Sequence, residues 1–313
     1  MAEHSQSSQF KRKNRKQRSN KIKGRVLVVV LRVLSYFSFA SAQSIGRLIG
    51  ELLFRFPGKL KTTTQKNLTS CFPDASTSEI QHLMHQTFVH SGMLAAEMAQ
   101  AWFWPVDKCL KQIKKINNKD ILDSAVKEGR GVICIVPHLG SWEFLNYHIL
   151  DNYPGMAMYK PAKIPALDDL ILRGRKQSGL EMVTADASGV KSVFKHLKKG
   201  GVTFILADQE PDEKGGVFAP FFGIPALSMT LVAKLTQKTG AIVIAAYAQR
   251  LGNHQGFDVY YKSGNEKLYS SDLLEAVTGL NELVESCVQD IPEQYQWSYK
   301  RFNKRPGRGV RFY

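Results

Sequence analysis

The stretch His138–Glu143, with the sequence HLGSWE, holds the residue types from which a general base and its partner are built. A neutral imidazole can take a proton from an alcohol when a carboxylate fixes the proton on its other ring nitrogen. On one continuous helix, five residues span about 500°, so His138 and Glu143 would point roughly 140° apart. A strand-to-helix break inside the stretch removes this obstacle, and we then predict that Glu143 orients His138. The alternative is a satisfied core histidine followed by an acid that merely favours a first helical turn.

The residues around this stretch predict such a break. Gly131–Val136 is a compact apolar run typical of a buried strand. Gly140 and Ser141 then offer a turn and a helix N-cap, so Trp142–Leu150 can continue as a helix. His138 would therefore lie at the carboxyl end of a buried strand, where open α/β sheets place their ligands.

Helical and strand patterns alternate along the chain after residue 120. We predict strands at 131–136, 156–159, 181–184, 202–207, 241–247 and 257–261, and helices at 120–128, 142–150, 165–178, 189–199, 229–239 and 273–289. This alternation indicates an α/β fold with a mostly parallel mixed sheet flanked by helices. The segment Phe218–Pro225 is expected to be an apolar loop. The sequence has no GxGxxG, Walker A or GxSxG motif, which argues against nucleotide-binding and serine-hydrolase chemistry.

Four further polar residues lie where they can meet His138 at one edge of the sheet. Lys160 and Asp208 each follow a predicted strand, while Arg173 and Arg175 lie on a helix between strands. Arginine is suited to phosphate recognition through paired hydrogen bonds, so both arginines are candidate substrate-binding residues. The alternatives are a solvated helix face for the two arginines and a strand-end turn residue for Asp208.

We expect neither a metal nor a bound cofactor. Glu143 and His148 are five residues apart on the predicted helix, so they share no face on which to join His138 around a metal. The four cysteines lie far apart and form no CxxC pair, which indicates reduced thiols rather than a disulfide framework.

Positive charge is concentrated at the amino end of the chain. The formal net charge is +16, and the segment Lys11–Arg25 holds nine Lys or Arg and no acid. Such a tail is typical of nucleic-acid binding or of contact with anionic lipid headgroups. Because an apolar segment follows it and no nucleic-acid-binding motif does, we predict a cytoplasmic tail over residues 1–25 and no nucleic-acid partner.

The segment 26–56 is the predicted membrane anchor. Val26–Ala42 is apolar apart from Arg32 and small polar residues, and 43–56 continues with amphipathic character. A spanning helix needs about 20 mostly apolar residues, so the first part is marginal, and an interfacial or re-entrant anchor is equally consistent. A cleaved signal peptide is a weaker alternative because the basic region is long and Arg32 interrupts the apolar core. Residues 57–313 would then form the catalytic domain.

Taken together, these segments resemble the lipid A biosynthesis acyltransferase family, the late lauroyl/myristoyl acyltransferases. The matching blocks occur in the family's order, and they are His138–Glu143 as its HxxxxE box, Tyr159–Pro161 as its Tyr-Arg-Pro segment, the helix with Arg173 and Arg175 as its basic site helix, Leu206–Gln209 and Val217–Gly223 as its Asp-Gln and Phe-Phe-Gly blocks, and Gln296–Phe302 as its closing Trp/Arg block. Lys160 departs from the pattern, since arginine is common there.

The resemblance implies a glycerolphosphate-acyltransferase-like fold and transfer of a fatty acyl chain from acyl carrier protein to a hydroxyl of a Kdo-bearing lipid A precursor, a step of lipopolysaccharide biosynthesis. His138 would be the general base, with Glu143 stabilising its imidazolium. Arg175 or Arg173 would bind acceptor phosphate, and Asp208 would organise the site. The implied partners are acyl carrier protein, the lipid A precursor and membrane lipids, at the cytoplasmic face of the inner membrane.

Two other functions fit the same residues. One is an acyltransferase for another glycolipid or lysophospholipid acceptor, since the same catalytic pair would serve it. The other is a basic, membrane-tethered binding protein without catalysis. Acyl transfer that survives loss of the His138 imidazole would contradict the proposed base and favour the second of these.

Overall fold

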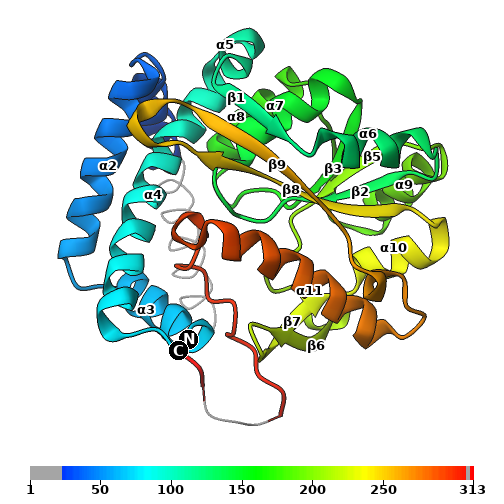
Figure 1. The fold of residues 1–313 in the computed structure, drawn as a ribbon. Helices are drawn as coiled ribbons and strands as arrows, with labels where there is room; N and C mark the ends of the chain where they lie inside the picture. Colours follow the sequence, from blue (N-terminus) through cyan, green and yellow to red (C-terminus); the bar gives the residue numbers. More distant parts are fainter. Residues whose placement is uncertain (1–22, 308–310) are drawn as a thin grey trace, which may run out of the picture.

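The computed structural model describes residues 23–307 and 311–313. The predicted tail over residues 1–25 therefore lies outside the described residues, except for its last three positions. Figure 1 shows a layered arrangement in which helices cover both faces of one large twisted sheet. A separate group of helices lies beside it, namely α2 (Phe39–Arg55), α3 (Lys59–Cys71) and α4 (Thr77–Phe103).

The large sheet has seven strands in the order β1-β9-β8-β2-β5-β3-β4. Their bounds are Ile113–Asn117 (β1), Val132–Ile135 (β2), Gly155–Tyr159 (β3), Glu181–Thr184 (β4), Val202–Ile205 (β5), Ile242–Arg250 (β8) and Phe257–Ser263 (β9). Neighbouring strands are parallel except for the antiparallel β8–β9 pair, so the predicted mostly parallel mixed sheet is confirmed. The edge strand β1 was not predicted, because three of the five residues in IKKIN are polar and its middle is exposed.

Strand β2 lies at the centre of the sheet and packs on both faces. Val132 and Cys134 point into one apolar cluster, and Ile133 and Ile135 point into the other. This follows from the two-residue period of a strand whose faces are both covered. The first face is covered by the helices α5 (Val106–Leu110), α6 (Lys119–Lys127), α7 (Trp142–Asn152) and α8 (Pro165–Gln177). The second is covered by α9 (Ala187–Lys198), α10 (Leu231–Thr239) and α11 (Leu273–Asp290).

The segment predicted as an apolar loop is a β-hairpin. Strands β6 (Gly216–Phe221) and β7 (Ile224–Met229) pair in antiparallel fashion as a separate two-stranded sheet. The prolines at 220 and 225 face each other in this ladder, and the turn at Phe222 and Gly223 has positive φ at both residues. Pro in a run argues against a strand, which is why the sequence pattern pointed to a loop.

The predicted anchor over 26–56 is not one helix. Residues 23–35 are helical, the chain then breaks at 36–38, and α2 (Phe39–Arg55) begins with Ser38 as its N-cap. Among the residues that the structure describes, no helix is long and apolar enough to cross a membrane. Several large apolar side chains of the two helices are exposed, namely Val26, Val29, Val30, Val33, Leu48, Ile49, Leu52 and Leu53.

Helix α2 packs along α4 (Thr77–Phe103). Helix α3 (Lys59–Cys71) lies near the amino-terminal end of α4, as Figure 1 shows. The two long helices approach so closely at Gly92 that a Cβ there would collide with the backbone of α2. A buried ion pair fixes this helical group to the sheet, because Glu97 of α4 bonds to Arg250 at the end of β8 at 2.5 and 2.6 Å. A side chain at position 92 would therefore force the two helices apart, and loss of either partner of the Glu97–Arg250 pair would leave a buried charge uncompensated.

Candidate active site

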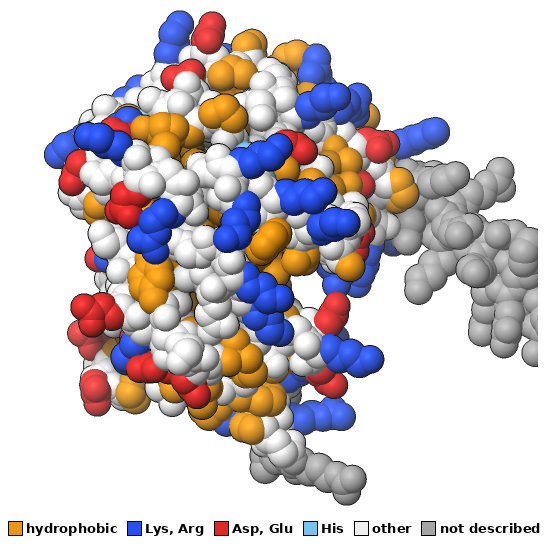
Figure 2. Space-filling model, turned by 90° about the vertical axis from the view of Figure 1, so that its right-hand side faces the viewer, with side chains coloured by type: hydrophobic (Ala, Val, Ile, Leu, Met, Phe, Trp, Pro, Cys, Tyr) orange, Lys and Arg blue, Asp and Glu red, His pale blue; other side chains and the backbone are white. Residues whose placement is uncertain are grey.

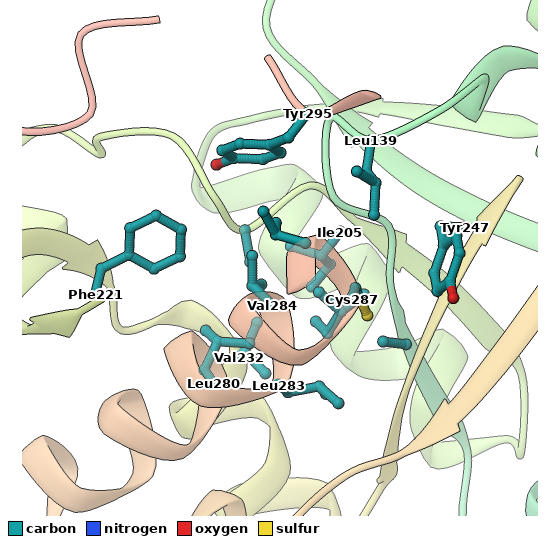
Figure 3. Close-up of a cluster of buried hydrophobic side chains, with 14 of the residues drawn as sticks. Leu139, Ile205, Phe221, Val232, Tyr247, Leu280, Leu283, Val284, Cys287 and Tyr295 are labelled. Atoms are coloured by element: carbon teal, nitrogen blue, oxygen red, sulfur yellow. The ribbon is translucent and has the colours of Figure 1, made fainter. Parts of the chain in front are cut away.

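The loop after β2 is held between β8 and the carboxyl-terminal segment. The amide of Gly140 donates to the carbonyl of Gln294, and the amide of Ser141 donates to the carbonyl of Ala248. Gly140 has a φ of +60°, and a Cβ there would collide with the carbonyl oxygen of Ala248. Leu139 is fully buried beside Tyr295, and Figure 3 shows both at one end of the apolar cluster that α11 contributes to. The backbone of His138 is therefore fixed on both sides by packed segments.

Asp208 is the carboxylate that contacts His138. Its Oδ1 lies 2.8 Å from His138 Nδ1, and its Oδ2 accepts a hydrogen bond of 2.9 Å from the His138 amide. The two residues follow β2 and β5, which are adjacent parallel strands, so their carboxyl ends bring the pair together. The Asp208 side chain is only 1% exposed and that of His138 is 15% exposed. Nδ1 thus carries the proton that Asp208 accepts, which leaves Nε2 as the basic nitrogen.

The charge of Asp208 is maintained despite its burial. Burial alone would raise the pKa of Asp208, but the charge of His138 and the hydrogen bonds from His138 outweigh it and leave this pKa below its ordinary value. Burial, and then the nearby Asp208 charge, raise the pKa of Tyr295 well above its ordinary value, so this neighbour stays protonated. An ionised Asp208 can therefore both fix the tautomer of His138 and stabilise an imidazolium.

The other ring nitrogen of His138 faces a pair of amides. Nε2 lies 3.2 Å from the Gln209 side-chain nitrogen, which also donates to Gln296 Oε1 at 3.1 Å. The indole of Trp142 meets the imidazole edge-on, with ring centroids 5.0 Å apart. Gln209 and Gln296 were not singled out as site residues, although both lie in segments that carried the family resemblance.

A cavity of about 210 Å³ opens beside His138, and we call it the His138 cavity. Trp142 forms part of its wall, helix α4 contributes His90, Ser91, Leu94, Ala95 and Met98, and the chain after α11 contributes Gln294, Tyr295, Gln296 and Ser298. The α4 residues were not predicted as site residues, since they lie far from the motif in the sequence and all but His90 are small or apolar. The cavity therefore places His138 in the wall of a space that a substrate could enter.

Comparison with known proteins gives the family of this chain. The model of the family described as "Bacterial lipid A biosynthesis acyltransferase" matches residues 9–304. The chain belongs to the bacterial lipid A biosynthesis acyltransferase family. It is 28% identical to the lipid A biosynthesis palmitoleoyltransferase and to the lauroyltransferase of Escherichia coli K12, over 84% of this chain and 85% of each relative. A lipid A biosynthesis acyltransferase of Haemophilus influenzae is 26% identical over 77% of both chains. The chain is thus an acyltransferase related to lipid A biosynthesis enzymes.

The pairing predicted for the second motif residue of this acyltransferase is wrong. Glu143 is 3% exposed and forms a two-pronged ion pair with Arg175 of α8, with N–O distances of 2.6 and 3.3 Å. Burial opposes the charge of Arg175, but Glu143 overcomes this and raises the Arg175 pKa. Five residues after His138, the chain has entered α7, and Glu143 in its first turn faces α8 rather than the imidazole.

The other two predicted substrate-binding residues, Arg173 and Lys160, are exposed at the surface. Arg173 is exposed, and its Nε donates to the carbonyl of Asp169 within α8. Lys160 is exposed after β3. The structure thus brings together His138 and Asp208, and separately Glu143 and Arg175. The roles in substrate binding predicted for Lys160, Arg173, Arg175 and Asp208 stay predictions. Among the described residues, no group of three or more His, Cys, Asp and Glu side chains could hold a metal ion.

A second buried polar cluster lies beside the cavity. Besides Glu97, the side chain of Arg250 contacts His90 Nδ1 at 3.0 Å, and Gln43 of α2 donates to Glu97 at 2.7 Å. Burial, then the charge of Arg250, lower the pKa of His90 to about 3, so His90 is neutral. Gln294 exchanges hydrogen bonds with the backbone of Arg250. This cluster joins α2, α4, β8 and the segment after α11 at one point.

Proposed function

We propose that this protein transfers a fatty acyl chain from an acyl carrier protein thioester to a hydroxyl of a Kdo-bearing lipid A precursor. The observation that supports this most directly is the buried Asp208 bonded to Nδ1 of His138, with His138 in the wall of the His138 cavity and its Nε2 contacted by the side-chain amide of Gln209. Acyl transfer to an alcohol requires a base at the attacking oxygen, and this pair supplies one. The reaction needs no bound cofactor, since the thioester already carries the activated acyl group.

In the proposed reaction, His138 Nε2 takes the proton of the acceptor hydroxyl while the hydroxyl oxygen attacks the thioester carbonyl carbon. Asp208 stabilises the resulting imidazolium through the 2.8 Å contact with Nδ1. The tetrahedral intermediate collapses when the carbon–sulfur bond breaks, and the leaving thiolate takes the proton from the imidazolium. The products are an ester and a free thiol, so all atoms and charges balance.

Gln209 also has a role in this proposal. Its amide nitrogen occupies the position in front of Nε2 where the acceptor hydroxyl must bind. A bound hydroxyl would displace this amide, which is then free to donate to the developing oxyanion. Gln296 holds the same amide at 3.1 Å and so keeps it beside the reacting atoms.

We further propose that the protein works at the cytoplasmic face of the inner membrane. The exposed apolar side chains of α2, together with a formal net charge of +16, suit a helix lying in the interface of an anionic membrane. Figure 2 shows Lys and Arg side chains across the middle of another face, with apolar side chains exposed among them. Such a basic surface also suits docking of an acidic carrier protein.

A transfer assay tests the activity. Purified protein is incubated with the lipid A precursor and either acyl carrier protein or coenzyme A as the acyl carrier, and the products are weighed by mass spectrometry. We expect a mass increase of one acyl chain with the carrier-protein donor, and its loss in His138→Ala. Transfer to a lysophospholipid but not to the lipid A precursor would favour the other acyltransferase function. Normal transfer in His138→Ala would overturn the proposed base.

Membrane binding is tested with vesicles containing anionic phospholipid. Leu52→Asp places a charge among the exposed side chains of α2, and we expect it to reduce co-sedimentation with the vesicles at least fivefold. Leu274→Asp is the matched control, because Leu274 is exposed on α11, away from this surface. Equal binding of both variants and the wild type would contradict the interfacial role of α2.

A further inference from the structure

Three hollows meet around helix α4, with the His138 cavity in the middle. An apolar groove of about 110 Å³ shares the wall residues Ser91, Ala95 and Ser298 with the His138 cavity. A polar pocket of about 440 Å³ shares His90 and Gln294 with the same cavity. The three volumes together fall within the ~300–1,000 Å³ typical of ligand sites. A ligand reaching His138 therefore has an apolar region on one side and a polar region on the other.

The apolar groove leads from His138 to the exposed surface of the helical group. At its far end, the walls are Ile49 and Leu53 of α2 and Leu60 of α3, which are 42%, 48% and 53% exposed. Its near end is formed by Ser91 and Ala95, two small residues that also line the His138 cavity. A groove of about 110 Å³ with this lining, open among exposed apolar side chains, fits a short segment of a hydrocarbon chain.

The polar pocket has a different chemistry. Its wall combines donors and acceptors of both charges, namely Arg47, Gln249, Arg250, Asn253, His254, Glu293 and Gln294. Arg250 is already neutralised by Glu97, and Glu293 opposes the charge of Arg47. A wall with nearly balanced charge and many hydrogen-bonding groups fits a head group rich in hydroxyls better than an isolated anion.

The two regions lie on different sides of helix α4. His90 and Ser91 are consecutive, so their side chains point about 100° apart around α4, one toward the polar pocket and one toward the apolar groove. Both also line the His138 cavity, which therefore lies between the two regions. Arg47 and Ile49 show the same division on α2, two residues apart.

We propose that the acceptor lipid binds across α4, with an acyl chain in the apolar groove, its hydroxyl-rich head group in the polar pocket, and the reacting hydroxyl at His138. This rests on the proposed function, which supplies a lipid alcohol as the second substrate. The far end of the groove lies on the surface of α2 that we propose to meet the membrane. An acyl chain of the acceptor can therefore pass from the bilayer into the groove without crossing water. A donor chain arrives on a water-soluble carrier protein and does not need such a path.

Steady-state kinetics in detergent micelles test each half of this binding mode. Ala95→Trp fills the groove from an exposed position, and Arg47→Met removes a guanidinium from the polar pocket. We expect each to raise the KM for the lipid acceptor about tenfold, as the loss of one good polar or apolar contact does. The KM for the donor should change less than twofold. The controls are Leu274→Trp on α11 and Arg55→Met on α2, which line none of the three hollows.

Each result has a definite meaning. A raised KM for the donor with Ala95→Trp would assign the groove to the donor chain and overturn the proposal. An unchanged acceptor KM with Arg47→Met would overturn the head-group assignment. Effects of the same size in both controls would show that the helical group responds to any substitution, and would also count against the binding mode.

Photo-crosslinking separates this binding mode from the proposed activity. His138→Ala protein is irradiated with a lipid A precursor carrying a diazirine on one acyl chain, or with a diazirine-labelled acyl carrier protein thioester. We expect the lipid probe to label peptides containing Ile49–Leu60 and Ser91–Ala95, and Ala95→Trp to abolish this label. Labelling of these peptides by the donor probe alone, or by neither, would overturn the binding mode. Lipid labelling without acyl transfer by the wild type would refute the proposed function while the binding mode stands.

Discussion

Replacing Asp208 by Asn tests which carboxylate supports the base. The carboxylate accepts from both the ring and the backbone amide of His138, at 2.8 and 2.9 Å. An amide offers only one acceptor in this place, so its NH₂ group must face either the backbone amide or Nδ1. When it donates to Nδ1, the ring proton moves to Nε2, and this tautomer cannot take a proton from the acceptor.

The size of the effect follows from the charge that is lost. A charge about 4 Å from the imidazolium contributes ~4 kcal/mol at an effective dielectric constant near 20, or roughly 10³ in rate. The corresponding substitution in a serine protease triad costs about 10⁴. We therefore expect Asp208→Asn to lower kcat by about 10²–10⁴, with a smaller change in KM.

The assay is the initial rate of acyl transfer by purified variants, with thermal unfolding monitored by circular dichroism to show that each is folded. Asp151→Asn is the control, since Asp151 is exposed at the end of α7. A folded Asp208→Asn protein within tenfold of the wild-type rate would refute the reasoning. The refutation would be clearest if Glu143→Gln were also inactive and fully stable. Glu143 would then contribute to the reaction itself, beyond its structural ion pair with Arg175.

Three further outcomes are expected from the buried charges. Glu143→Gln leaves Arg175 unpaired and should lower the free energy of unfolding by ~3–5 kcal/mol, as measured by urea titration. The double variant Glu143→Met with Arg175→Met should restore most of this stability. Equal losses in the single and the double variant would contradict the pairing. Glu97→Gln strands Arg250 in the same way, and we expect a similar loss, with no loss showing that water reaches the pair. The folded-state pKa of Asp208 lies below its ordinary value of 3.8, so its contribution is present above that pH and is lost as the pH falls. The urea midpoint of the wild type should consequently drop further between pH 5 and pH 3 than that of Asp208→Asn, and parallel drops would contradict it.

The sequence was sufficient to predict most of the sheet and the position of its reactive loop. The run before His138 is apolar on every residue because β2 is buried on both faces, and such runs are the clearest strand signal. The edge strand β1 and the β6–β7 hairpin were not predicted because they lack such apolar runs. Two lysines lie in the middle of β1, and prolines interrupt the hairpin strands. The break at 36–38 depends on the cap at Ser38, which is one serine among several in that segment.

Strand order is what the sequence could not supply for the site. Asp208 was predicted to lie near His138, but 70 residues separate them, and their contact requires that β2 and β5 be neighbours. Two βα units intervene along the chain, and β3 and β4 follow β5 toward the sheet edge. Glu143, by contrast, is five residues from His138, so its spacing suggested a contact that the folded chain does not make.

The geometry of α7 gives the His138–Glu143 spacing a different meaning. Residues 137–141 form the loop that presents His138, and Glu143 follows in the first turn of the helix that begins at Trp142. Its bond to Arg175 fixes the start of α7 against α8, while the amides of Gly140 and Ser141 fix the other side of the loop. A carboxylate at position 141 or earlier would lie in the loop itself, and one placed a residue before or after Glu143 would turn about 100° away from its direction. The five-residue spacing therefore specifies the frame that holds His138, and Asp208 on the neighbouring strand acts on its protonation.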